Sequence, residues 1–158
     1  MGCSPLFIGK TLVVAGIVSL AFRPAIGKAI QMFGEKKILM MNSAVLFFVC
    51  FAYAFSMDLF SKETALIILT GCFVIDNLMF ACEVARTTYI ARICEKKEDI
   101  TPSIYMGLSI NHVFSIIFAV IGGMIWTKTG CYQAVFMISA VVTILSGVVA
   151  STLPPKNA

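Results

Sequence analysis

Residues 65–86 read ALIILTGCFVIDNLMFACEVAR, and this stretch decides what kind of fold the chain can adopt. It is long and apolar enough to cross a membrane as a helix, since about 20 apolar residues span roughly 30 Å of hydrocarbon. Yet Asp76 and Asn77 lie near its middle, and Glu83 and Arg86 follow at its downstream end. Hydrocarbon does not solvate an ionised group, so such residues face a bundle interior or a wet cavity. The stretch therefore predicts a membrane helix that lines a pathway.

Apolar stretches of similar length fill the rest of the chain. Of its 158 residues, 59% are hydrophobic and only 13% are charged, and the mean hydropathy is +0.96. A soluble domain of this size could not bury so much apolar surface. We therefore predict an all-α, polytopic membrane protein embedded in a lipid bilayer, with a single membrane domain over residues 1–158. Its five transmembrane helices are expected at residues 5–22, 38–56, 65–86, 104–126 and 132–152.

The basic residues lie in short connections and not on one surface, which argues against a nucleic-acid partner. If the connection 23–37 is cytoplasmic, nine of the 12 basic residues share its side: Arg23, Lys28, Lys36, Lys37, Arg86, Arg92, Lys96, Lys97 and Lys156. The other three, Lys10, Lys62 and Lys128, lie on the opposite side. Because positive charge is enriched in cytoplasmic connections, we expect the N-terminus outside and the C-terminus in the cytoplasm.

The charged residues of the third helix follow a helical spacing. Asp76 and Glu83 are seven residues apart and share one face at 3.6 residues per turn, while Glu83 and Arg86 are three apart and can pair. Asp76 is interpreted as a coupling carboxylate or substrate ligand, with an interhelical hydrogen bond of its protonated form as the alternative. The Glu83–Arg86 pair is either structural or part of a gate.

Three further polar residues are candidates with a structural alternative. Asn77 suits either a substrate contact or an interhelical hydrogen bond. In the fourth helix, Asn111 and His112 place two polar side chains in the first half. His112 is the only histidine and suits a proton relay or ligand, although a lone histidine is more often a packing residue. The candidates for substrate or coupling-ion binding are thus Asp76, Asn77, Asn111 and His112.

Catalysis and cofactor binding have little support in the sequence. The chain has no HExxH zinc pair, no GxSxG nucleophile elbow and no Gly-rich phosphate loop. Its six cysteines include no CxxC pair, so they predict neither a zinc site nor a disulfide framework. We expect a protein that is not an enzyme and has no catalytic residue, metal site or cofactor.

One segment resembles a known family. Residues 27–37 read GKAIQMFGEKK and are similar in spacing to the cytoplasmic signature of major facilitator superfamily transporters: a Gly, a short spacer, Phe-Gly and basic residues. Gly27, Gly34, Lys36 and Lys37 carry this resemblance, and the family context would add Glu83 and Arg86 to a cytoplasmic gate. Where the family usually has Asp followed by Arg, this chain has Gln31 and Met32.

The downstream half strengthens this resemblance. Residues 85–91 (ARTTYIA), 106–112 (MGLSINH) and 121–126 (IGGMIW) resemble the tenth and eleventh helices of bacterial permeases of this superfamily, and residues 130–149 resemble the twelfth. The resemblance implies helices eight to twelve of the C-terminal half. It also implies a bacterial inner membrane and transport of a small solute by alternating access. The first, third and fourth helices would line the cavity, and the second and fifth would lie outside.

Five helices are fewer than such a transporter needs. Asp76 would face lipid or an unformed cavity without further helices, which is costly. We therefore expect that the chain is a fragment or truncated product, or that it assembles with the missing N-terminal half or with complementary helices. The alternative is a small, non-transporting interaction or regulatory subunit that uses its glycine-rich faces to bind partner helices.

Overall fold

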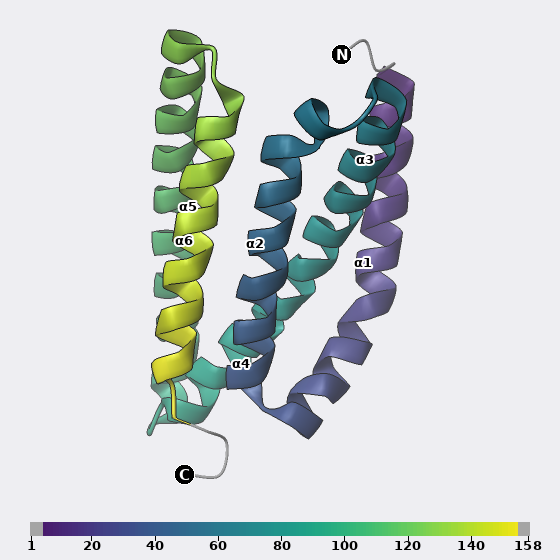
Figure 1. The fold of residues 1–158 in the computed structure, drawn as a ribbon. Coiled ribbons are helices and arrows are strands. Elements are labelled where there is room, and N and C mark those ends of the chain that lie inside the picture. Colours follow the sequence, from purple (N-terminus) through teal and green to yellow (C-terminus); the bar gives the residue numbers. More distant parts are fainter. Residues whose placement is uncertain (1–4, 155–158) are drawn as a thin grey trace.

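The computed structural model describes residues 5–154, and all of the elements in this range are helical. Figure 1 shows α1 (Pro5–Phe33), α2 (Glu35–Leu59), α3 (Lys62–Met79), α4 (Glu83–Ile93), α5 (Lys97–Thr129) and α6 (Tyr132–Thr152), with a 3₁₀ turn, η1 (Phe80–Cys82), between α3 and α4. α3, η1 and α4 together form one long apolar segment, Lys62–Ile93. The described part of the chain thus has five helices long and apolar enough to cross a membrane, and the expected all-α, multi-pass class is confirmed.

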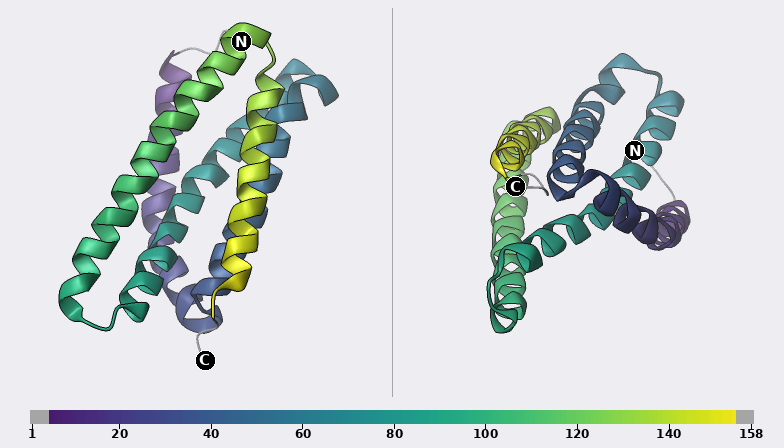
Figure 2. Two further views of the ribbon diagram at one scale, coloured as in Figure 1. Left: turned by 90° about the vertical axis from the view of Figure 1, so that its left-hand side faces the viewer. Right: turned by 90° about the horizontal axis from the view of Figure 1, so that it is seen from below.

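The spans run up and down, with α2 at the centre. Figure 1 shows α2 between the α5–α6 pair on one side and α3 and α1 on the other, and the view from below in Figure 2 agrees. The most extensive packing is between α2 and α6, and α2 also contacts α1, α3 and α4. α5 lies outermost, packed mainly against α6 and α4.

The buried core consists mostly of small side chains. Ala15, Ala54, Ala65, Ala81 and Ala85 are fully buried, whereas dozens of large apolar side chains are exposed. This pattern suits a membrane bundle, where small residues let helices approach and large apolar ones face lipid. One compact apolar cluster forms where α1, α2, η1 and α4 meet; it contains Ile26, Ile30, Ile38, Ala81, Cys82 and Ala85.

The connection expected at residues 23–37 is mostly helical. α1 continues through Pro24 to Phe33, and Gly34 alone separates it from α2. Proline is tolerated inside membrane helices because neighbouring groups satisfy the freed backbone. Gly34 has φ 82° and ψ 157°, a conformation essentially restricted to glycine, and this allows the abrupt reversal. The sharp turn is therefore one residue long.

Other helix ends also differ from those expected, with one exception. α5 begins at Lys97 and not at residue 104, because helices continue beyond the apolar stretch and Glu98 and Asp99 in the first turn favour the helix N-terminus. α6 has the predicted bounds, Tyr132–Thr152. Lys156, which was counted with the cytoplasmic basic residues, lies outside the described residues.

The roles of the first and second spans differ from the expectation, since α1 contributes no residue to the polar cavity and α2 does. α2 is not peripheral but central, since Ser43 on α2 faces Gly147 on α6 and lets the two helices pack closely. α5, by contrast, contains no buried residue. The fourth span is therefore the most exposed element of the bundle.

Candidate functional site

A polar cavity of about 270 Å³ lies among three of the five spans. Its walls come from α2, the α3–η1–α4 segment and α5, where Leu39, Leu46, Met79 and Phe80 supply apolar surface. The polar lining consists of Asn42, Asp76, Glu83, Arg86, Asn111 and Ser115. Four of the residues singled out in the sequence, Asp76, Glu83, Arg86 and Asn111, therefore meet at one place.

Asp76 brings an acidic group to the cavity from the last turn of α3. Its side chain is partly buried, and its carboxylate makes no hydrogen bond or ion pair within residues 5–154. Burial of an ionisable group without a partner is costly, so Asp76 is available to a cation or hydrogen-bond donor that enters the cavity.

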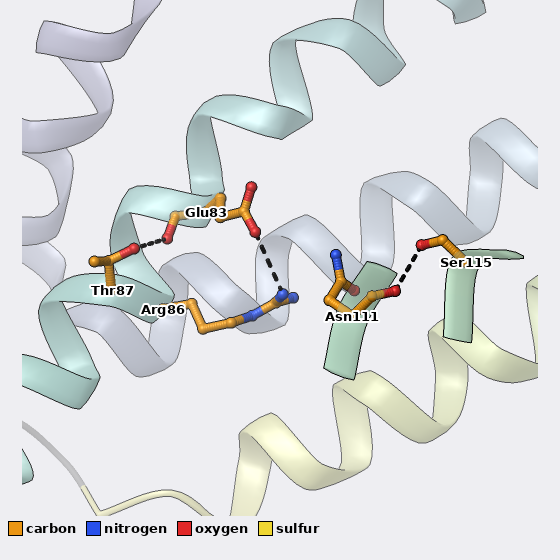
Figure 3. A network of polar contacts seen from close by, with 5 residues as sticks. All are labelled: Glu83, Arg86, Thr87, Asn111 and Ser115. Carbon is orange, nitrogen blue, oxygen red and sulfur yellow. Dashed lines mark hydrogen bonds and ion pairs between the residues drawn. The ribbon is translucent and has the colours of Figure 1, made fainter. Parts of the chain in front are cut away.

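Glu83 and Arg86 form the predicted ion pair on α4. Glu83 Oε1 and Arg86 Nη1 are 3.8 Å apart, and 38% and 54% of the two side chains are exposed. Such a long, exposed contact contributes little stability, about 0–1 kcal/mol. Thr87 Oγ1 also donates a hydrogen bond of 3.0 Å to the Glu83 carbonyl oxygen, as Figure 3 shows. The two charged side chains remain accessible from the cavity.

α5 supplies the opposite wall. In Figure 3 the Arg86 side chain extends from α4 toward Asn111 and Ser115. Ser115 Oγ donates to the Asn111 carbonyl oxygen at 2.8 Å, so the hydroxyl proton is used within α5. The Asn111 side-chain amide is left to serve the cavity.

Asn42 on α2 was not among the sequence candidates. It lines the cavity, and its Oδ1 atom is buried without a hydrogen-bond partner in the described residues. A buried acceptor that lacks a donor costs roughly 1–3 kcal/mol, so Asn42 is an unsatisfied polar residue at the cavity wall. The signal in the sequence was the isolated amide in an apolar span.

Asn77 and His112 lie away from the cavity lining. Asn77 Nδ2 donates to the Phe73 carbonyl oxygen at 2.8 Å, and the Asn77 carbonyl oxygen accepts from Ser19 Oγ on α1 at 3.1 Å. The Asn77 side chain therefore bonds within its own helix, and the link between α1 and α3 goes to its backbone carbonyl. His112 is exposed on the outer helix α5.

The signature-like segment forms the turn at the end of the bundle where α4 also lies (Figure 1). Gly27 is within α1, Gly34 is the turn, and Lys36 and Lys37 begin α2. They do not line the polar cavity.

Glu35, which was not among the sequence candidates, lies beside this turn and is only 4% exposed. Its Oε2 is 3.2 Å from Arg92 Nη1 on α4, and the Arg92 guanidinium also lies 5.4 Å from the Tyr89 ring centroid. An acidic residue directly after the turn glycine was the available signal for this contact.

Residues 5–154 contain no group of three or more His, Cys, Asp and Glu side chains that could hold a metal ion. The cavity offers a small solute one unpaired carboxylate, one ion pair and two amides. Comparison with family models, curated proteins and solved structures found no match for this chain.

Proposed function

We propose that this chain is part of a secondary transporter of the major facilitator superfamily, which moves a small solute across a membrane by alternating access. The observation that carries the proposal is the polar cavity, in which Asp76, Glu83 and Arg86 lie between membrane spans. Charged residues at such places are expensive and mark substrate or ion pathways. The spacing of the segment 27–37 adds the family resemblance.

Each polar group has a role in this proposal. Asp76 binds a cationic group or a coupling proton, Asn42 and Asn111 form hydrogen bonds to the solute, and the Glu83–Arg86 pair exchanges partners when the solute enters. The protein binds and releases its solute unchanged, so we propose no catalysis and no cofactor.

Complementary membrane helices complete the transporter. No residue of α5 is buried, although Asn111, His112 and Ser115 lie in its middle third. Lipid would leave the Asn111 and His112 side chains without partners, whereas a second set of helices, such as the N-terminal half of a facilitator, would supply them.

We place the transporter in the bacterial inner membrane with a cytoplasmic C-terminus. The α1–α2 turn, the α4–α5 connection and the end of α6 lie at one end of the bundle (Figure 1), and the basic residues concentrate there. A fluorescent protein fused after Ala158 would fold and fluoresce in the cytoplasm. Alkaline phosphatase activity at this position would reverse the orientation.

The test of transport is access to the cavity from both sides. In a cysteine-free background, Ser115→Cys is exposed to a membrane-impermeant thiol reagent in right-side-out and in inverted vesicles. We expect labelling from both sides, because an alternating site opens to each in turn. Val120→Cys is the matched control on α5: Val120 is 56% exposed but does not line the cavity, and lipid would protect it.

The second candidate function is a non-transporting subunit that binds partner helices. α5, which has no buried residue, favours it, with Gly123 open on its surface. In that case Ser115→Cys is labelled from one side only, or from neither side if a partner helix covers α5.

A further inference from the structure

The polar cavity adjoins a larger, mostly apolar cleft. This cleft, of about 930 Å³, runs between α2 and α6, and it shares Leu39, Asn42, Leu46 and Arg86 with the polar cavity. Most of its remaining surface comes from α6, including Val142, Leu145, Val149 and Ala150. The two spaces therefore form one continuous site with a polar end and an apolar end.

A third space joins the same site. It measures about 560 Å³, lies between α5 and α6, shares Asn111 and Ser115 with the polar cavity, and shares Phe114 and Val142 with the apolar cleft. Phe114 and Phe118 stack on this wall, with ring centroids 6.4 Å apart. The apolar end is thus wide and partly aromatic, which suits a bulky, ring-containing body.

The polar end carries a net negative charge when Asp76 is ionised. Glu83 and Arg86 offset each other at 3.8 Å, and the unpaired carboxylate of Asp76 remains. Asn42 also lines this end, and the amide is an uncharged polar group that does not offset the carboxylate. In a space of low dielectric constant, one uncompensated negative charge strongly favours a cationic ligand over an anionic one.

We propose that the solute is an amphipathic organic cation, with its charged group at Asp76 and its apolar body in the cleft between α2 and α6. This inference rests on the proposed transport function and specifies its substrate class. A cation with no apolar body would leave the cleft empty. An anion with an apolar body would be repelled by the Asp76 carboxylate.

Tetraphenylphosphonium and tetraphenylborate test this proposal, because they have the same shape and apolar surface but opposite charge. Binding of each to the purified full chain in neutral detergent is measured by isothermal titration calorimetry, with tetramethylammonium as the cation that lacks a large body. We expect tetraphenylphosphonium to bind tighter than either of the other two by about tenfold or more. Equal binding of the two tetraphenyl ions, or a preference for the borate, would overturn the proposal.

Variants locate the two ends of the site. Asp76→Asn is expected to abolish the preference for the cation, and Asp76→Glu to retain most of it. Ser146→Phe fills the apolar cleft and is expected to weaken tetraphenylphosphonium but not tetramethylammonium binding. Ser151→Phe, on a face of α6 that does not line this cleft, is the matched control. A preference that survives Asp76→Asn would also contradict the proposal.

The two proposals fail in different ways. If Ser115→Cys is labelled from both sides but the tetraphenyl ions bind equally, transport stands and the substrate class is wrong. If the cation preference holds and labelling occurs from one side only, the chain binds amphipathic cations without transporting them.

Discussion

The carboxylate of Glu35 lies 3.2 Å from the guanidinium of Arg92, which ties the start of α2 to the end of α4. Glu35 is 4% exposed, whereas 30% of the Arg92 side chain is exposed. The loss of its charge partner therefore costs more free energy for Glu35 than for Arg92. Removal of Arg92 would leave a buried carboxylate without a charge partner, and removal of Glu35 would leave a cation that reaches water.

We predict that substitutions at Arg92 and at Glu35 lower the stability of the protein by different amounts. Arg92→Gln should destabilise the protein by roughly 2–4 kcal/mol, less than the roughly 3–5 kcal/mol of broken buried pairs because water reaches Arg92. Glu35→Gln should cost less, and the double variant should recover part of the loss. Thermal unfolding in detergent measures all three. Equal effects of the two single variants would show that the burial of Glu35 does not govern the pair.

The two signature glycines should respond differently to alanine. Gly34→Ala forces a Cβ atom into the φ 82°, ψ 157° conformation and should cost about 1–3 kcal/mol. Gly27→Ala is the matched control. Gly27 is inside α1 and nothing lies within 4 Å of the position that a Cβ atom would take, so stability should be unchanged or rise by up to about 1 kcal/mol. Unfolding midpoints of the two variants, compared with the unmodified chain, decide the point. A tolerated Gly34→Ala would mean that the turn relaxes.

The contact between α2 and α6 should be sensitive to side-chain size at Gly147. A Cβ atom there would lie 3.3 Å from Ser43 Cβ, so Gly147→Leu must push the helices apart, at a cost of about 1–3 kcal/mol. Gly123→Leu, on the exposed face of α5 with nothing within 4 Å of its Cβ position, should be neutral. Size-exclusion profiles and unfolding temperatures provide the readout. Similar losses in both variants would refute this account of the packing.

Ser19 should contribute stability through its link to α3. Ser19→Ala removes the 3.1 Å hydrogen bond to the Asn77 carbonyl oxygen and should cost about 0.6 kcal/mol, typical of interhelical bonds in membranes. Ser151→Ala removes a hydrogen bond within α6 at an exposed position and should have a smaller effect. The comparison needs unfolding curves with matched detergent and lipid content. A larger loss at Ser151 would contradict it.

The sequence predicts the number of spans because their apolar lengths match the membrane. It does not predict where α1 and α5 end, since hydropathy marks the segment in hydrocarbon and the backbone can continue as a helix beyond it. Residues 23–33 therefore read as a connection but form the last turns of α1.

The site was predictable in part for a similar reason. The spacing of Asp76, Glu83 and Arg86 identifies one face, and all three line the cavity. Asp76 and Asn77 are adjacent, so they point about 100° apart on a helix, and only the neighbouring helix determines which one faces inward. Asn42 was missed because its burial depends on how the neighbouring helices pack, which the sequence does not specify.

The turn at Gly34 also determines where the chain can be cut. Gly34 is buried and leaves no accessible stretch between α1 and α2, whereas Glu95 and Lys96 are exposed between α4 and α5. Exposed connections tolerate protease cleavage and inserted sequences, whereas buried connections do not. An epitope tag therefore belongs after Glu95. A break at the same place would divide the chain into a piece with three spans and a piece with two, which can be coexpressed.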